Sequence, residues 1–261
     1  LYAALGNPVK RLELSYEAEK IVSELAPYLS IHPRVTSLTN FLLACIDANN
    51  VEVGNWGIEQ LNSIRYTTKT QEQWAFSMSL FGLLPFFLVF RQYDNALAME
   101  ARVLQLFRDE KAVMEPGPKS NVYNCYLAIN IINEYFEAAA EWLQLFLDEP
   151  RMPEKQHLLP LPMLLGTIAH FELRNQTVVE SLCRSLRRTI KSLGWKKDFH
   201  HDVIHFLEKT PSKLDESDYW EKFRAALKES ELGNSNNRPS KIFTFSTWVE
   251  SKIQKRPLRE I

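Results

Sequence analysis

Two acidic and two histidine side chains near residue 200 are spaced so that a helix would place them on one stripe. They are Asp198, His201, Asp202 and His205. Two imidazoles four residues apart on a helix can share a divalent metal ion, with carboxylates beside them as further ligands. The same spacing arises on any solvated helix face. We therefore favour a solvated face, expect no bound metal, and keep a metal site as the alternative.

A second stripe on a helix face is basic. It consists of Arg184, Arg187, Arg188 and Lys191, and no acidic residue occurs between positions 182 and 197. Such a stripe can contact phosphates or an acidic peptide. The whole chain is balanced, however, with 31 Lys and Arg against 32 Asp and Glu, whereas proteins that bind nucleic acid usually carry more basic or exposed aromatic side chains. We favour a solvated face, then an acidic segment of a protein partner, and do not expect nucleic acid.

Motifs for catalysis or cofactor binding are missing from the sequence. It contains no GxSxG, HExxH, P-loop or GxGxxG pattern. The cysteines Cys45, Cys125 and Cys183 are odd in number, far apart and set in apolar helical contexts, which predicts buried thiols rather than a disulfide framework or a nucleophile. Unpaired cysteines also favour a reducing compartment, so we expect a cytoplasmic protein. We expect no catalytic residue and no cofactor, and a helical enzyme with an unrecognised site is the least favoured alternative.

The elements that must position these side chains are helices. Apolar residues recur with helical periodicity in almost every segment, and strand-like alternation is nearly absent outside residues 243–245. Only 8 glycines occur, which argues against turn-rich β-sandwiches and barrels. Helices are expected over about 15–28, 34–48, 52–65, 71–91, 93–110, 119–133, 135–149, 155–173, 176–193, 197–208, 216–231 and 247–255. Their short connections group most of them into helical hairpins.

One of these helices resembles a membrane span. Residues 74–90 carry no charge, but a span needs roughly 20 apolar residues. The segment also contains Ser77, Ser79, Gly82 and Pro85. We expect a helix buried between its neighbours and no membrane insertion.

Small residues recur at matching places in the hairpins. Steps of 39, 42 and 41 residues separate Gly57, Ala96, Ala138 and Val179. Seven residues further on come Ile64, Val103, Leu145 and Leu186. A small residue lets two helices approach closely, and the larger residue fills the gap to the next pair. Because one pair alone cannot bury its apolar face, this pattern favours a stack of hairpins.

The stretch from 134 to 150 (EYFEAAAEWLQLFLDEP), with Tyr126 and Leu127 before it, resembles the tetratricopeptide-repeat family. Tyr135 matches the opening aromatic residue, Ala138 the small residue, Trp142 the bulky ring and Pro150 the closing proline. Tyr93 and Ala96 match the opening again. The family's repeat is about 34 residues, so the longer steps here are nearer the HEAT and armadillo range. The resemblance implies a right-handed α-solenoid of antiparallel helix pairs that binds proteins or peptides.

The sequence predicts two regions, a helical-repeat domain over 1–232 and a linker with a C-terminal docking segment over 233–261. A polar stretch at 231–241 precedes Phe243, Phe245, Trp248 and Ile253. That is too much apolar surface to leave in water. We expect the segment to dock on the last helices as a cap, with docking into another subunit as the alternative.

The expected function is a scaffold that binds a peptide or protein on a concave face built from the first helix of each pair. One such helix would contribute Asn121, Asn124, Ala128 and Asn130. The asparagine amides offer donors and acceptors that suit a peptide backbone. The alternative is a ligand-sensing helical domain with an internal pocket. The identity of the partner and the oligomeric state stay open, and because the sequence begins with Leu1 rather than Met we expect part of a longer or processed chain.

Overall fold

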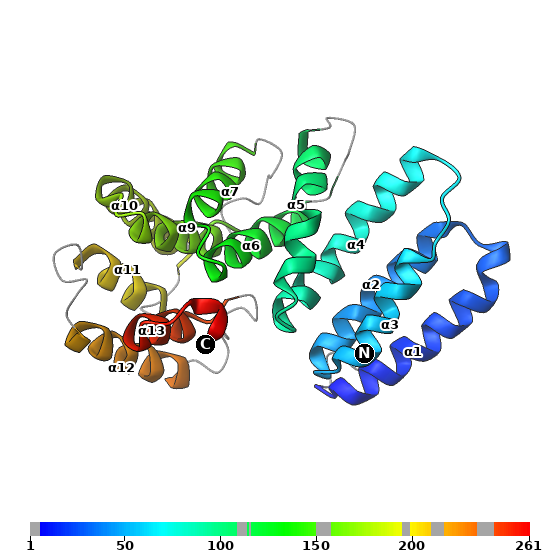
Figure 1. Cartoon of the computed structure of the whole chain (residues 1–261), viewed down its shortest axis with the longest axis horizontal. Coiled ribbons are helices and arrows are strands. Elements are labelled where there is room, and N and C mark those ends of the chain that lie inside the picture. The colour runs from blue at the N-terminus through cyan, green and yellow to red at the C-terminus, as the bar shows by residue number, and fades with distance from the viewer. Residues whose placement is uncertain are drawn as a thin grey trace. The chain divides into compact units, whose positions relative to one another are not determined.

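Every regular element in the part of the chain that the computed structural model describes is a helix (Figure 1). The structure describes residues 6–108, 114, 116–149, 158–194, 199–209, 217–233 and 243–261, and no strand occurs among them. The predicted all-α class is therefore confirmed. The chain divides into two compact units, Leu1–Val122 and Tyr123–Ile261. The predicted boundary between 232 and 233 falls inside the second unit, and the division into a repeat domain and a docking segment stays a prediction.

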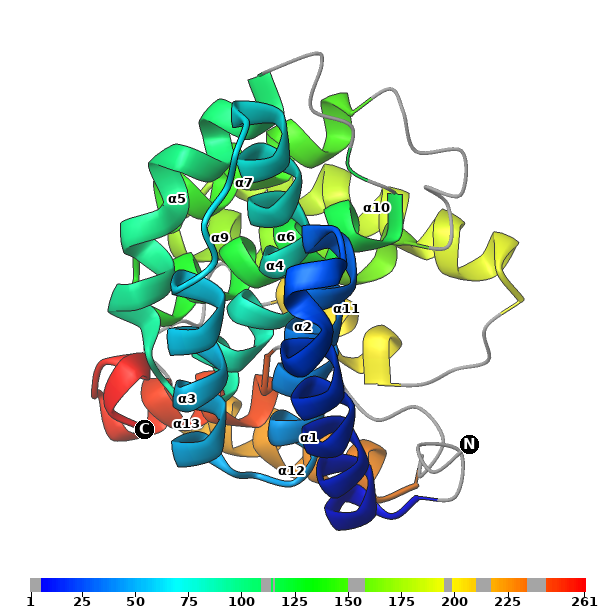
Figure 2. The ribbon, with the colours of Figure 1, turned by 90° about the vertical axis from the view of Figure 1, so that its right-hand side faces the viewer.

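The first unit is built around α2. It contains α1 (Pro8–Leu25), a short 3-10 helix (Ala26–Tyr28), α2 (Ile31–Asp47), α3 (Val51–Asn62), α4 (Lys69–Val89), α5 (Tyr93–Arg108) and the start of α6 (Pro116–Ile132). α2 packs against α1, α3 and α4, and α4 packs against α5; Figure 2 shows α1 and α2 side by side. Leu38, Phe41 and Leu42 of α2 are fully buried. The core of this unit therefore lies along α2.

The most apolar helix of the first unit is α4. By length and composition α4 is the one described helix that could cross a membrane, and half of its apolar window is buried inside the structure. A core helix of a soluble protein has the same composition. The buried part packs closely on α2, since a Cβ added at Gly82 would lie 2.9 Å from the carbonyl oxygen of Thr39. Packing between helices accounts for much of the apolar sequence of α4.

The second unit contains the rest of α6 and the helices that follow it. They are α7 (Phe136–Asp148), α9 (Pro160–Glu172), α10 (Gln176–Ser192), α11 (Phe199–Lys209), α12 (Ser217–Gly233), α13 (Phe245–Gln254) and a 3-10 turn (Leu258–Glu260). α9 packs against α7, α10 and α11, and α12 packs against α11 and α13. The ring of Tyr126 stacks on Trp142 with centroids 4.5 Å apart, so α6 and α7 form a hairpin.

One helix-ending turn recurs along the chain. Among the described helices it ends α2, α4, α6 and α9, and in each of these copies a residue other than glycine has a positive φ between 53° and 60°; Lys255, at the end of α13, has the same left-handed conformation. In the copies that end α2, α4, α6 and α9, the amide N–H of the next residue donates to the carbonyl five positions back, with N–O distances of 2.7–2.9 Å. Both features define the Schellman motif, which satisfies carbonyls that the helix end leaves unpaired. The left-handed residues are Asn49, Arg91, Glu134 and Arg174.

This turn corrects the register that the sequence pattern suggested. Counting five residues from each left-handed residue leads to Gly54, Ala96, Ala139 and Val179, and seven residues further to Leu61, Val103, Phe146 and Leu186. All eight are buried. The sequence pattern had used Ala138 with Leu145, but Leu145 is 41% exposed. The run of three alanines made this one-residue shift impossible to see in the sequence. In the first hairpin the count from the turn gives Gly54, although Gly57 and Ile64 are buried as well.

The tetratricopeptide-like stretch is only partly used for packing. Trp142 is 2% exposed, and its ring packs against the rings of Tyr123 and Tyr126 on α6. Tyr135, in contrast, immediately precedes α7 and is 53% exposed. The residue that matches the family's opening aromatic residue is therefore half exposed to solvent and is not part of the buried core. Pro150 lies outside the described residues.

The C-terminal segment lies against earlier helices of the second unit (Figure 1). The indole Nε1 of Trp248 donates to Oε1 of Glu172 on α9 at 2.7 Å, and Nζ of Lys252 is 2.8 Å from Oε2 of the same carboxylate. The backbone N–H of Leu258 donates to Oε1 of Glu134, at 3.4 Å, in the turn between α6 and α7. The Trp248 ring also packs edge-on against Phe171 of α9 and Trp220 of α12, so α13 covers apolar side chains of its own chain.

Candidate functional site

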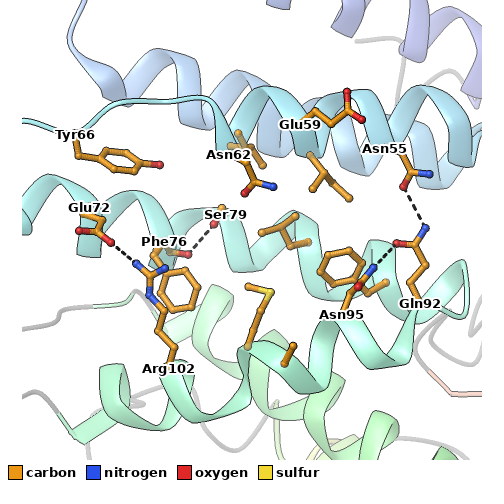
Figure 3. Close-up of a pocket in the computed structure, with 16 residues that line it drawn as sticks. Asn55, Glu59, Asn62, Tyr66, Glu72, Phe76, Ser79, Gln92, Asn95 and Arg102 are labelled. Atoms are coloured by element: carbon orange, nitrogen blue, oxygen red, sulfur yellow. Dashed lines mark hydrogen bonds and ion pairs between the residues drawn. The ribbon is translucent and has the colours of Figure 1, made fainter.

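The first unit contains a groove of about 840 Å³ between α3, α4 and α5, which we call the α3–α5 groove (Figure 3). α4 forms its floor, and α3 and α5 form its two walls. The floor residues are Phe76, Ser79, Leu83 and Phe87. The walls include Asn55, Glu59 and Asn62 from α3, and Asn95, Met99 and Arg102 from α5. Each set is spaced by three or four residues, so each forms one stripe of its helix.

Local sequence places the three helices in this arrangement. α4 begins after Thr68, whose hydroxyl accepts the backbone N–H of Gln71 at 3.2 Å. α3 lies close to α4 because Gly54 has no side chain: an added Cβ would be 2.0 Å from the ring of Phe86. The turn with Arg91 then ends α4 and leads directly into α5. The positions of α3 and α5 are thus set by their contacts with α4, through Gly54 and through the turn at Arg91.

One end of the groove is lined by side-chain amides. Nε2 of Gln92 donates to Oδ1 of Asn55 at 3.1 Å, and Nδ2 of Asn95 donates to Oε1 of Gln92 at 3.1 Å. This chain of hydrogen bonds links α3 to the start of α5. Each amide carries two donors and an acceptor with two lone pairs, so the three groups retain capacity for a ligand's peptide groups.

The other end of the groove carries charge and aromatic surface. Nη2 of Arg102 lies 2.8 Å from Oε1 of Glu72, and the guanidinium stands 3.9 Å from the centroid of the Phe76 ring. Burial raises the pKa of Tyr66 above its ordinary value, an effect that Glu72 reinforces and Arg102 opposes. The Tyr66 phenol therefore stays neutral at neutral pH and can donate a hydrogen bond at this end.

The rim of the groove is open to solvent and slightly acidic. Glu59 and Asn62 on α3 are exposed, as is Arg102 on α5. Among the described lining residues the charged groups are two carboxylates and one guanidinium, a net charge of −1. Because Glu72 is paired with Arg102, the unbalanced charge belongs to Glu59.

A second hollow in the first unit is less suited to hold a ligand. It measures about 660 Å³ and lies between α1 and α2, with Leu14, Ala18 and Val22 on one side. Its charged lining residue Arg11 is already engaged by Asp47. The α3–α5 groove has the larger volume and the more varied set of polar groups.

The structure places the predicted contact residues of α6 mostly in the interior. Asn121 and Asn124 are partly buried, while Ala128 and Asn130 are 0% and 1% exposed. Nδ2 of Asn130 donates to the carbonyl oxygen of Tyr126 one turn earlier, at 2.9 Å. Ala128 and Asn130 thus present almost no surface to a partner, since α6 is buried on nearly all sides from Val122 to Ile131, and a role for Asn121 and Asn124 stays a prediction.

The basic stripe lies on the exposed face of α10, as a solvated face would. Arg184, Arg187, Arg188 and Lys191 are all exposed. Nη2 of Arg187 forms an ion pair with Glu208 of α11 at 2.6 Å. The stripe is not part of the α3–α5 groove, and its contact with an acidic partner stays a prediction.

The candidate metal ligands are only partly described. Asp198 lies outside the described residues, and the side chain of His205 is exposed. Within the described part of the chain, no group of three or more His, Cys, Asp or Glu side chains is arranged to hold a metal ion.

The three cysteines are free and buried. Burial raises the pKa of the Cys45 and Cys183 thiols to about 12 and that of Cys125 further still. These thiols are protonated at neutral pH and lack the thiolate that nucleophilic chemistry needs.

The groove residues carry only a weak signal in the sequence. Asn55, Glu59 and Asn62 recur at helical spacing on the polar side of α3, and Asn95 and Arg102 do the same on α5. That signal is visible in the sequence, but it also fits two ordinary solvated faces. Comparison with protein-family models, with curated proteins and with solved structures finds no match.

Proposed function

We propose that the protein is an interaction module that holds a peptide segment of a partner protein in the α3–α5 groove. The observation that carries the proposal is the combination of an apolar floor with amide-bearing walls in one open groove. Apolar side chains of a peptide gain by leaving water on such a floor. Its backbone groups need hydrogen-bond partners when they are covered, and the amides of Asn55, Asn62 and Asn95 can supply them.

The proposal includes a stack of hairpins as the architecture that carries the groove. The recurrence of one turn at steps of 42, 43 and 40 residues supports this arrangement. The groove differs from the expected concave surface, since its walls are the second helices of two hairpins and its floor is a first helix. A partner would contact α3 and α5 from the side on which their polar stripes lie.

Selection of a phage-displayed library of random peptides tests this function. The protein should enrich a common sequence pattern, and the variant Ala98→Trp should not, because Ala98 lines the groove and a Trp side chain would occupy it. Ala225→Trp is the matched control, since Ala225 is an exposed alanine of α12. Equal enrichment by parent and Ala98→Trp would exclude the groove as the binding site. No enrichment by the parent would contradict the function itself.

A further inference from the structure

We propose that the occupant of the α3–α5 groove is an extended peptide of about five residues with an apolar side chain and a neighbouring Lys or Arg. This inference rests on the proposed function and names the chemical class of the partner. It follows from three properties of the groove: its length, the division between floor and walls, and the sign of its unbalanced charge.

The length of the groove matches a short extended segment. The floor runs from Phe76 to Phe87 on α4, and at 1.5 Å per residue these side chains span about 16 Å. An extended chain advances about 3.3 Å per residue, so about five residues cover that distance. The amides on both walls suit an extended chain, whose backbone groups lack partners, whereas a helix already pairs its own backbone groups. The amides of Asn55 and Asn95, joined through Gln92, bridge the two walls at one end.

The division between floor and walls predicts the order of contacts. In an extended peptide alternate side chains point in opposite directions. One side chain can therefore rest on Leu83, Phe87 and Met99, while the next points toward the rim. The backbone between them would pass the amides of Asn62 and Asn95, which can hydrogen-bond to peptide groups irrespective of sequence.

The unbalanced charge selects a cation on the rim. Glu59 is exposed on the α3 wall, and Arg102 is occupied by Glu72 and by the ring of Phe76. A Lys or Arg side chain that points to the rim would meet the Glu59 carboxylate, whereas an Asp or Glu there would be repelled. Exposed ion pairs are weak, so a Lys-containing peptide should bind about two- to fivefold more tightly than its Gln counterpart.

Acetylated, amide-ended hexapeptides with a central Leu test this inference. A Lys, Gln or Glu residue follows the Leu, and fluorescence anisotropy of labelled peptides gives Kd. We expect the order Lys, Gln, Glu for the parent, from tightest to weakest, and the reverse order for Glu59→Lys. Glu141→Lys, the same charge change on an exposed residue of α7, should keep the parental order. In 1 M salt the differences should largely vanish, because exposed charges are then screened.

The outcomes separate this inference from the function on which it rests. Peptide binding with no preference for Lys, or with the same order in Glu59→Lys, would overturn the inference and leave a peptide-binding groove. Binding of N-acetyl-lysine amide as tight as that of the hexapeptide would overturn it in favour of a small-molecule site. No binding of any hexapeptide to a parent protein with a native circular-dichroism spectrum would contradict both proposals.

Discussion

Replacing Arg174 with glycine should stabilise the protein, because Arg174 holds a backbone conformation that favours glycine. Its φ is +59°, in the turn between α9 and α10, and its side chain is exposed. The left-handed conformation costs a residue with a Cβ atom about 1–2 kcal/mol. Glycine avoids this cost but loses about 0.5–1 kcal/mol more conformational entropy on folding. The net expectation for Arg174→Gly is about 0.5–1 kcal/mol of added stability.

Urea denaturation followed by circular dichroism measures this difference. In a chain of this size the gain corresponds to a rise in Tm of about 1–4 °C. Arg174→Ala is the matched control, since alanine removes the same side chain but keeps the Cβ and should bring no gain. Glu134→Gly should gain less than Arg174→Gly, because it also removes the acceptor of the Leu258 N–H.

Two results would refute the reasoning about this turn. If Arg174→Ala stabilised as much as Arg174→Gly, the effect would come from the arginine side chain rather than from the backbone. If Arg174→Gly destabilised the protein, the residue would not hold a left-handed conformation in solution. Either result would also remove the main support for a recurring hairpin unit.

The remaining predictions concern packing and titration. Gly166→Ala should destabilise the second unit by about 1–3 kcal/mol, since the new Cβ would lie 2.3 Å from Cδ2 of Leu143; an unchanged denaturation midpoint would contradict the close contact of α7 and α9. Trp248→Phe should cost about 1–3 kcal/mol of stability, because it leaves Oε1 of Glu172 without its indole donor. If Trp248→Phe and the parent unfolded at the same urea concentration, the hydrogen bond between α13 and α9 would contribute nothing to stability. The buried thiols have raised pKa values, so the unfolded chain releases their protons at lower pH than the folded chain does. The free energy of unfolding should therefore fall as pH rises above about 9. The native thiols should also react slowly with a disulfide reagent until urea unfolds the chain. Fast labelling of all three cysteines in the native protein would contradict their burial.

Apolar periodicity was sufficient to predict the helical class and most helix positions. Helices such as α2 and α10 have one regular apolar stripe, and the predicted limits differ from the observed ones by only a few residues. The exact register was harder, because the packed position in α7 lies within the run Ala138, Ala139 and Ala140. Three equal small residues in a row cannot show which of them faces the neighbouring helix.

The left-handed turns could not be predicted for a different reason. Helix-ending residues of this conformation are commonly glycine or asparagine, but three of the four recurring turns use Arg91, Glu134 and Arg174. Their side chains give no signal of a positive φ. The conformation goes with the backbone hydrogen bonds that close each helix end, which are formed whatever the side chain.

The groove was not predicted because it depends on three helices at once. The polar stripe of α3, the apolar side of α4 and the polar stripe of α5 are each ordinary when considered alone. Asn55 and Gln92 are far apart in sequence, and only folding brings their amides within 3.1 Å. The asparagines of α6 gave a more conspicuous sequence pattern, yet the packing around that helix buries Asn130.

The most direct test of the proposal that the α3–α5 groove binds a peptide is the response of the groove's own side-chain amides to an added peptide. Two-dimensional 1H–15N spectra resolve the NH2 groups of asparagine and glutamine. On addition of the Leu-Lys hexapeptide, we predict shifts of the NH2 resonances of Asn55, Asn62, Gln92 and Asn95, with no shift for exposed Gln144 of α7. Shifts confined to residues outside α3, α4 and α5, with these four resonances unchanged, would contradict the claim that the groove is where this protein holds its partner.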